Sequence, residues 1–383
     1  MLIAGLTALF TSSLVAWLII LTEDIHGRHT ADTILDGPQK INPVVTPRVG
    51  GIAILTGLLA GAWVASETGN GRDWWVVLVL ASLPAFAGGL IEDITKRFTV
   101  SSRLITTFVA AGFGFFLLDA RISEVEVPGV DILLGYTLAS FALTLFAVGG
   151  FAHAMNIIDG FNGLSGVVAL MMLASLAVVA GQVADTAILH ACIVIGGAVL
   201  GFLFFNYPRG LIFAGDSGAY LMGFLIAELA VMLVHRNSEV SPWFPLLLLF
   251  YPVWETLFSA YRRKLVRGRS PGAPDALHMH TLVYRRLVRW MGGARSTNAL
   301  LARNVLTAPY LWLLAAIAML PATIFWSKSE VLKLMVLLFA VFYVWLYRRI
   351  VRFRTPRGLI LRVRHPDLEV DSQKDERNTR ILK

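Results

Sequence analysis

The sequence predicts an all-α protein that crosses a membrane many times, and three observations lead there. Of the 383 residues, 56% are hydrophobic and 15% are charged, which is far too apolar for a soluble domain of this length. Apolar stretches of about 20 residues, the length of a helix that crosses a bilayer, recur along the chain. Lys and Arg gather in alternate loops between these stretches.

The apolar stretches predict about eleven transmembrane helices. They cover residues 2–22, 49–66, 74–91, 104–118, 132–154, 163–181, 186–205, 217–234, 243–260, 305–326 and 331–347. The first stretch has no basic segment before it and no small-residue cleavage site after it, so we interpret it as an uncleaved helix.

The basic residues predict the orientation. With the N-terminus outside, 28 of the 33 Lys and Arg residues lie in the inside loops, so we expect an N-out, C-in topology. This asymmetry accounts for the net charge of +8, and no nucleic-acid partner is expected. The single cysteine, Cys192, excludes an intrachain disulfide and a cysteine-based metal site.

We expect one membrane domain and a short tail. Residues 1–350 form the membrane domain, with a long basic loop at 261–304, and residues 351–383 form a cytoplasmic tail. The basic start of the tail suits contact with anionic membrane lipids, and its polar end, 371–383, is predicted to be disordered.

Four polar clusters occur where predicted helices end on the inside face. The first is Glu92-Asp93. Adjacent carboxylates at membrane depth repel each other unless a cation or proton intervenes, which indicates function. A solvated helix end neutralised by Lys96 and Arg97 explains the pair equally well.

The second and third clusters combine amides, carboxylates and glycines. The segment Asn156–Gly163 holds more polar side chains than an ordinary turn needs, which favours ligand binding. The segment from Asn206 leads to Gly215-Asp216-Ser217-Gly218 at the start of a helix. Asp216 is suited both to an N-cap and to binding Mg²⁺, which uses one or two carboxylates plus substrate phosphates.

The fourth cluster is His278-Met279-His280 in the basic loop. Zn²⁺ binding is the weaker interpretation because no cysteine and no i, i+4 histidine pair accompany it, and imidazoles among arginines suit phosphate oxygens better. Residues 282–291 have the pattern of an interfacial amphipathic helix. Glu255 is a further ionisable residue at membrane depth, for which pairing with Arg262 or Arg263 is the simpler expectation and a functional role the weaker interpretation.

The four clusters, in their order along the chain, resemble the motifs of the polyprenyl-phosphate N-acetylhexosamine-1-phosphate transferase family. This family includes GlcNAc-1-phosphate transferases and the MurNAc-pentapeptide translocase. The resemblance extends from Pro47-Arg48-Val49-Gly50-Gly51 to the loop of His280 and leaves out the tail after Arg348. It implies a multi-pass enzyme of the bacterial cytoplasmic (inner) membrane with its site on the cytoplasmic face. A homodimer is compatible with the sequence.

The resemblance assigns roles to residues of this chain. The expected catalytic residues are Glu92, Asp93, Asp216, His278 and His280. Asp216 is the principal ligand for Mg²⁺, or Mn²⁺ in its place, and Asp93 is the second metal ligand. The expected substrate-binding residues are Arg48, Asn156, Asp159, Asn162, Asn206, Arg262, Arg285 and Arg286.

Three positions depart from the family pattern. Glu92 replaces a more usual Asp, Lys96 stands where many members have Asp, and Thr281 replaces a frequent third His. The first departure changes the distances expected at the acidic pair, and the third argues against the MurNAc-pentapeptide branch.

The function implied is transfer of N-acetylhexosamine-1-phosphate from UDP-GlcNAc, or a modified relative, to undecaprenyl phosphate, which releases UMP and initiates a lipid-linked glycan such as the O-antigen of lipopolysaccharide. The alternative is a secondary transporter for an anionic solute. A transporter would place charged groups near the bilayer midplane, where this chain has only Glu228 and His190.

The basic asymmetry generates a test of topology. A reporter that is active only in the periplasm, fused after Lys383, is expected to stay silent, whereas the same reporter in the acidic segment 119–131 is expected to be active. Signal from the fusion after Lys383 would contradict the N-out, C-in orientation and the cytoplasmic site.

Overall fold

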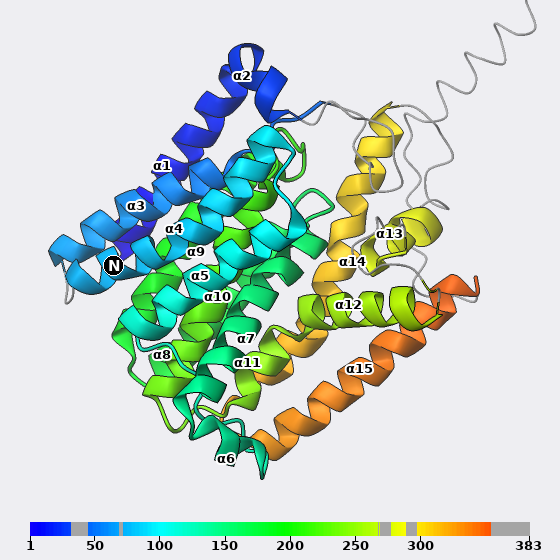
Figure 1. Ribbon diagram of the computed structural model, residues 1–383. Coiled ribbons are helices and arrows are strands. Elements are labelled where there is room, and N and C mark those ends of the chain that lie inside the picture. The colour runs from blue at the N-terminus through cyan, green and yellow to red at the C-terminus, as the bar shows by residue number, and fades with distance from the viewer. Residues whose placement is uncertain (32–44, 69–71, 267, 269–276, 289–296, 354–383) are drawn as a thin grey trace, which may run out of the picture.

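The computed structural model describes residues 1–31, 45–68, 72–266, 268, 277–288 and 297–353 (Figure 1). Within these ranges the chain is helical, and its one β feature is an isolated bridge between Ala31 and Pro47. The expected all-α class is therefore confirmed for the described part of the chain. The end of the predicted amphipathic helix, 289–291, and the tail from 354 lie outside the described residues.

Ten described helices are long and apolar enough to cross a membrane. They are α1 (Leu2–Leu21), α3 (Gly50–Thr68), α4 (Arg72–Thr95), α5 (Val100–Leu117), α7 (Thr137–Ile158), α8 (Leu164–Gln182), α9 (Thr186–Asn206), α10 (Gly215–Arg236), α14 (Thr297–Ile324) and α15 (Ser329–Val351). The shorter elements are α2 (Glu23–Thr30), α6 (Val130–Leu134), α11 (Trp243–Leu248), α12 (Phe250–Tyr261), α13 (Met279–Leu282) and the π-helices η1 (Arg262–Val266) and η2 (Val283–Leu287).

The prediction of one continuous helix at 243–260 is wrong. This stretch forms α11 and α12, which meet at Leu249, and α12 runs in a different direction from α11 (Figure 1). Pro252 supplies the physical reason: it has no N–H to bond the carbonyl of Leu248, which is the last residue of α11.

Helix α10 is the centre of the bundle. In its most apolar window 89% of the residues are buried, against 17% for α15, and it packs against α3, α4, α5, α7 and α8. Helix α1 lies on α3 and α9 through a stripe of small residues at a four-residue spacing, Ala4, Ala8, Ser12 and Ala16. Small residues let membrane helices approach closely, which suits this contact.

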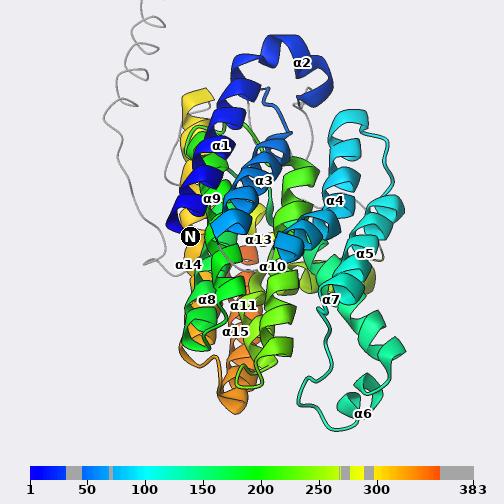
Figure 2. The same ribbon diagram turned by 90° about the vertical axis from the view of Figure 1, so that its left-hand side faces the viewer.

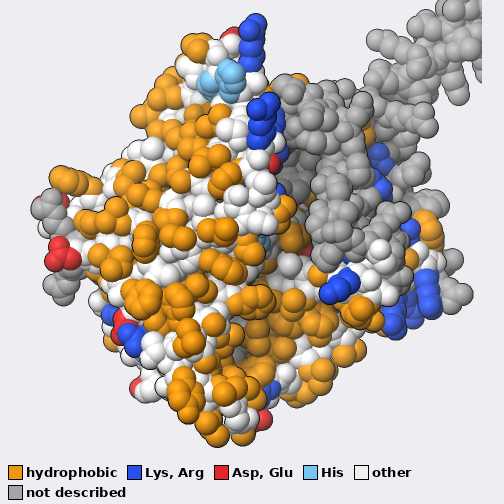
Figure 3. All heavy atoms as spheres, viewed as in Figure 1, with side chains coloured by type: hydrophobic (Ala, Val, Ile, Leu, Met, Phe, Trp, Pro, Cys, Tyr) orange, Lys and Arg blue, Asp and Glu red, His pale blue; other side chains and the backbone are white. Residues whose placement is uncertain are grey.

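The outer surface of the bundle is largely apolar. Figure 3 shows a broad hydrophobic face over the bundle, with most of the visible Lys and Arg toward the upper and right-hand parts of this view and smaller groups of charged side chains at the lower left and the bottom. Figures 1 and 2 both place α2 and α6 at opposite ends of the molecule. The ends of α1 and α4 and the starts of α5 and α10 belong to the end that carries α2, and all four predicted polar clusters lie there or next to it.

The closest approach of α4 to α10 generates a stability test. A Cβ on Gly89 would lie 2.4 Å from the backbone nitrogen and Cα of Ser217, so Gly89→Ala must push the two helices apart. We expect a loss of about 1–3 kcal/mol, the usual cost of overpacking, measured as a lower midpoint of thermal unfolding in detergent. Gly150→Ala on α7 is the matched control because no atom lies within 4 Å of its added Cβ. Equal midpoints for the two variants would contradict this contact.

Candidate functional site

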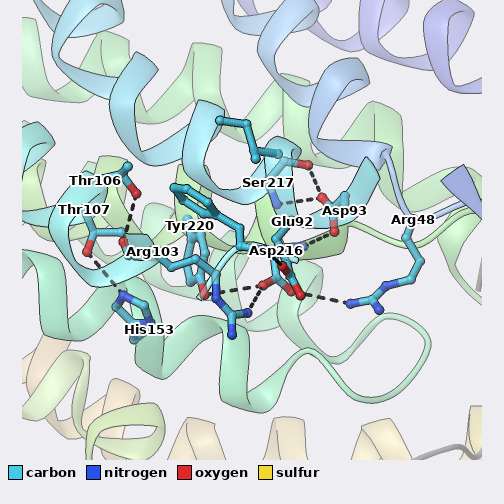
Figure 4. A network of polar contacts seen from close by, with 12 residues as sticks. Arg48, Glu92, Asp93, Arg103, Thr106, Thr107, His153, Asp216, Ser217 and Tyr220 are labelled. Carbon is cyan, nitrogen blue, oxygen red and sulfur yellow. Dashed lines mark hydrogen bonds and ion pairs between the residues drawn. The ribbon is translucent and has the colours of Figure 1, made fainter. Parts of the chain in front are cut away.

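The site forms where the end of α4, the start of α5, the end of α7 and the start of α10 meet (Figure 4). Each element contributes a polar side chain: Asp93 from α4, Arg103 from α5, His153 from α7 and Asp216 from α10. The loop before α3 adds Arg48, which reaches Asp216 from the opposite side to Arg103 (Figure 4). Residues separated by more than 160 positions therefore share one cluster.

Asp93 accepts hydrogen bonds from the first turn of α10. Its Oδ1 accepts the backbone N–H of Asp216 at 2.8 Å, and its Oδ2 accepts the backbone N–H of Ser217 at 2.9 Å and the Ser217 hydroxyl at 2.7 Å. The first N–H groups of a helix have no partner within the helix, so a carboxylate here satisfies them and meets the positive end of the helix dipole. Asp93 thus caps α10 from another helix.

The expected N-cap role of Asp216 is wrong. Helix α10 begins at Gly215, and no side chain of its own caps it. Gly215 has a φ of +70°, and a Cβ there would lie 1.9 Å from the carbonyl oxygen of Arg48 and 2.5 Å from Oδ2 of Asp93. Because glycine permits both the turn and this close approach, Asp93 can take the cap position and the side chain of Asp216 is directed elsewhere.

Asp216 is held by cations and a hydroxyl. Its Oδ2 accepts Nη1 of Arg103 at 2.5 Å and the hydroxyl of Tyr220 at 3.4 Å, and its Oδ1 lies 3.4 Å from Nη2 of Arg48. Asp216 is buried, whereas the Arg48 side chain keeps 34% of its surface exposed. The carboxylate is a potential ligand for a metal ion, and the two guanidinium groups and the helix start beside it attract phosphate groups.

Three residues of the site, Arg103, Tyr220 and His153, were not predicted from the sequence. Arg103 lies in the first turn of α5, which Thr99 caps by accepting the N–H of Ser102. The His153 ring lies 4.7 Å from that of Tyr220, and its Nε2 lies 3.3 Å from the Thr107 hydroxyl. Signals were available: ionisable residues in apolar helices favour function, and Tyr220 follows Asp216 by four residues, one helical turn.

The two adjacent carboxylates have different partners. Glu92 accepts the backbone N–H of Phe98 at 2.8 Å and so holds the turn after α4, whereas Asp93 caps α10. Lys96, the expected neutralising partner, donates instead to the carbonyl of Ala31 at 2.7 Å. Successive side chains of a helix point about 100° apart, which explains why Glu92 and Asp93 contact different partners.

Asp159 lies in the turn after α7 and accepts the hydroxyl of Ser165. Desolvation raises the pKa of its carboxyl to about 6, a rise that the Ser165 hydrogen bond and the charge of Arg48 oppose. Asn156, in the last turn of α7, lies beside the hydroxyl of Tyr220. These two expected substrate-binding residues therefore lie beside the Asp216 cluster.

Asn162 and Asn206 hold neighbouring turns together. The side chain of Asn162 donates to the carbonyl of Pro208 at 3.1 Å, and Asn206 accepts the N–H of Gly163 at 2.7 Å and donates to the carbonyl of Ile212 at 2.8 Å. Both residues are buried. Their contacts are those of a scaffold, and a role in substrate binding stays a prediction.

The two histidines of the basic loop lie against the Asn156–Gly163 turn. His278 and His280 are buried, and their rings stack with centroids 5.2 Å apart. The His280 ring contacts that of Phe161, and a Cβ on Gly160 would lie 3.2 Å from its Nε2. The structure thus places the histidine motif against the Asn156–Gly163 turn.

Two of the three expected substrate-binding arginines of this loop contact α15. Arg262 lies over the Tyr347 ring at 5.6 Å, and Arg286 donates to the carbonyls of Ile350 and Val351 at the end of α15. Arg285 is exposed. The described contacts of Arg262 and Arg286 anchor the loop to α15, and their binding role stays a prediction.

The carboxylates fit a metal ion that the substrate helps to hold. Among the described residues no group of three or more His, Cys, Asp and Glu side chains could enclose a metal. Asp93 and Asp216 are two hard oxygen donors held together by the bond from the Asp216 N–H. That set matches Mg²⁺, which usually combines one or two carboxylates with substrate phosphates and water.

The fold and the site together define a multi-pass helical membrane protein. Two buried carboxylates, Asp93 and Asp216, lie with arginines at the ends of its central helices. Residues 75–234 match the family described as Glycosyl transferase family 4, a range that contains Asp93, Arg103, Asp159 and Asp216. The expected resemblance to polyprenyl-phosphate sugar-1-phosphate transferases is confirmed.

Three relatives illustrate the similarity. A probable undecaprenyl-phosphate N-acetylglucosaminyl 1-phosphate transferase of Bacillus subtilis is 25% identical over 63% of this chain and 66% of its own length, slightly less than two thirds. A decaprenyl-phosphate N-acetylglucosaminephosphotransferase of Mycobacterium leprae is 28% identical over 70% of this chain and 77% of its own. A phospho-N-acetylmuramoyl-pentapeptide-transferase of Bacillus mycoides is 30% identical over 49% of this chain and 61% of its own length.

The raised pKa of Asp159 generates a prediction of pH dependence. Because the folded pKa of about 6 exceeds the ordinary value, the folded state binds the proton more tightly than the unfolded state does. The difference in free energy of unfolding between the parent and Asp159→Asn should therefore favour the parent most near pH 4. This difference should shrink as the pH rises to about 6 and should stay constant above about 7. Thermal unfolding of both proteins from pH 4.5 to 7.5 measures it.

Asp73→Asn is the matched control, because Asp73 is exposed and lies at the start of α4, at the opposite end of that helix from Asp93. A constant difference between the parent and Asp159→Asn across the range would contradict the raised pKa.

Proposed function

We propose that this protein transfers N-acetylhexosamine-1-phosphate from a UDP-sugar to undecaprenyl phosphate and releases UMP. The observation that carries the proposal is the acidic pair Asp93 and Asp216 at the start of α10, with Arg48 and Arg103 bound to Asp216. The polyprenyl-phosphate transferases among its relatives support the same reaction class.

The substrates pose an electrostatic problem that this cluster can solve. A lipid phosphate and a nucleotide diphosphate are both anions, and two unit charges about 4 Å apart repel by about 4 kcal/mol at an effective dielectric constant near 20. Arg48 and Arg103 supply positive charge at the start of α10, whose N-terminal N–H groups also attract anions. Stabilising charge in this way is the largest part of catalysis in phosphoryl transfer.

Mg²⁺ is part of the proposal. Asp216 would hold it, with Asp93 as the second carboxylate, and Mn²⁺ would serve in its place. When bound, the ion would neutralise oxygens of the diphosphate and of the attacking phosphate. Asp93 has a second task without the ion, because its bonds to the N–H groups of Asp216 and Ser217 fix where the Asp216 carboxylate lies.

The reaction is a single displacement at phosphorus. An oxygen of the lipid phosphate attacks the phosphorus that carries the sugar and forms a new P–O bond. The bond from that phosphorus to the oxygen shared with the uridine-bearing phosphate breaks, and UMP leaves with that oxygen. A phosphate monoester with a second pKa near 6 is largely dianionic at pH 7, so no protein base is required to remove a proton.

The remaining residues position the donor. Asp159 and Asn156 lie beside the Asp216 cluster, and His278 and His280 approach the same turn, where they suit the nucleotide and the diphosphate. We take GlcNAc or a modified relative, such as a 6-deoxy-HexNAc, as the donor sugar. The product would initiate a lipid-linked glycan such as O-antigen at the cytoplasmic face of a bacterial inner membrane.

One observation favours the transport alternative. Glu228 is fully buried in α10, and neither of its carboxylate oxygens has a hydrogen-bond partner among the described residues. A buried ionisable group in a membrane helix is a feature of ion and substrate pathways. Transport moves a solute across sealed vesicles without chemistry, so the two functions are separable by experiment.

Product analysis tests the proposal. The purified protein with undecaprenyl phosphate, Mg²⁺ and a panel of UDP-sugars should form a lipid diphosphate sugar, identified by mass spectrometry, and equimolar UMP. Asp216→Asn should lose at least about 100-fold in turnover, because the amide lacks the charge that holds the metal, and excess Mg²⁺ should restore part of it.

Glu330→Gln is the matched control, since Glu330 is exposed and lies at the start of α15. Release of UMP without lipid product, or uptake of an anionic solute by sealed vesicles without any UMP, would refute transfer as the function.

A further inference from the structure

A buried carboxylate outside the Asp216 cluster holds the histidine motif. Glu255 on α12 is 1% exposed. Its Oε1 accepts Nδ1 of His278 at 2.9 Å and the backbone N–H of Met279 at 3.2 Å, and its Oε2 accepts the hydroxyl of Tyr343 on α15. The expectation that Glu255 pairs with Arg262 or Arg263 is therefore wrong, and its partner is the first histidine of the motif.

These contacts fix the proton on the His278 ring. The hydrogen bond made by one ring nitrogen of a histidine determines which nitrogen carries the proton and how the ring is oriented. Because a carboxylate only accepts, Nδ1 of His278 must be the donor. The Met279 N–H on the same oxygen ties the backbone of the motif to α12 as well.

The arrangement continues from His278 into the site. The His278 ring stacks on His280 with an interplanar angle of 11°, and His280 packs edge-on against Phe161 with centroids 5.5 Å apart. Phe161 belongs to the turn that contains Asp159. A continuous set of contacts thus joins Tyr343 of α15, through Glu255 and both histidines, to the turn beside Asp216.

We propose that Glu255 is a positioning residue that holds His278 and, through it, His280 against the 159–163 turn, with Tyr343 fixing Glu255 from α15. This inference rests on the proposed function, in which the histidines contact the diphosphate. It goes beyond that function by giving α12 and α15 a part in the reaction, although neither helix lies in the matched family range, 75–234.

A role in stability alone is the competing explanation. Removing one partner of a buried charged network is destabilising whether or not the network serves a reaction. The two explanations differ in what happens to the His278 ring in a variant that stays folded. Glu255→Gln keeps the shape of the side chain but offers an amide that can donate to Nδ1, which would move the proton to Nε2.

The test combines a spectroscopic and a kinetic measurement on the full chain. With ¹⁵N-labelled histidine, the ring signals of His278 are assigned by their loss in His278→Gln. The parent should show a protonated Nδ1, and Glu255→Gln should lose that signature. Its kcat should fall about 10- to 100-fold, by analogy with the loss of a hydrogen-bond partner from a metal-binding histidine, with a smaller change in KM.

Two further variants keep the proposal testable if Glu255→Gln folds poorly. Glu255→Asp retains a carboxylate and should restore the Nδ1 signature and part of kcat. Tyr343→Phe removes one hydrogen bond to Glu255 and leaves His278 in place, so it should cause a smaller loss. The controls are Glu330→Gln at the opposite end of α15 and Tyr136→Phe, because Tyr136 is exposed.

Three outcomes would overturn the proposal: parent-like His278 signals in Glu255→Gln, an unchanged kcat, or losses of turnover that only follow the amount of folded protein in all three variants. If the parent itself forms no lipid product, the proposed function fails, and the His278 signals alone then decide whether Glu255 positions the motif.

Discussion

The structure depends on one interaction, in which the Asp93 carboxylate accepts the first N–H groups of α10. Helix α10 is the buried centre of the bundle, so its start cannot be solvated by bulk water, and unpaired N–H groups at that depth are costly. The carboxylate from α4 satisfies them. It thereby fixes α4 to α10 and leaves the Asp216 side chain directed at Arg48 and Arg103.

The charge of the site follows from the same constraint. A carboxylate buried among membrane helices is stable only when it is paired or hydrogen-bonded, and Asp216 meets two guanidinium groups while Asp93 meets a helix start. Because these groups come from the loop before α3 and from α4, α5 and α10, the bundle must be assembled before the site exists. The cost of an unpaired buried charge thus ties the position of each carboxylate to the packing of these helices.

The second half of the site is built on the C-terminal helices by a similar device. Glu255 is buried on the broken ninth segment, and its partners are His278, Met279 and Tyr343. The break after α11 lets α12 leave the direction of α11 (Figure 1), and Glu255 on α12 accepts hydrogen bonds from His278 and Met279 of the basic loop. Two buried carboxylates, one in each half of the chain, therefore organise the two groups of polar residues that meet at the 156–163 turn.

The sequence by itself determined the helical class, the apolar segments and the positions of the polar clusters, because hydrophobic length and isolated charges are local properties. Ten of the eleven predicted segments are continuous helices, and the predicted clusters at Asp93, Asp159 and Asp216 meet at one site. Only the tertiary structure decided which carboxylate caps α10, that Arg103, Tyr220 and His153 belong to the site, and that Glu255 pairs with His278. Those facts depend on which helices are neighbours, and neighbours far apart in the chain leave no local pattern.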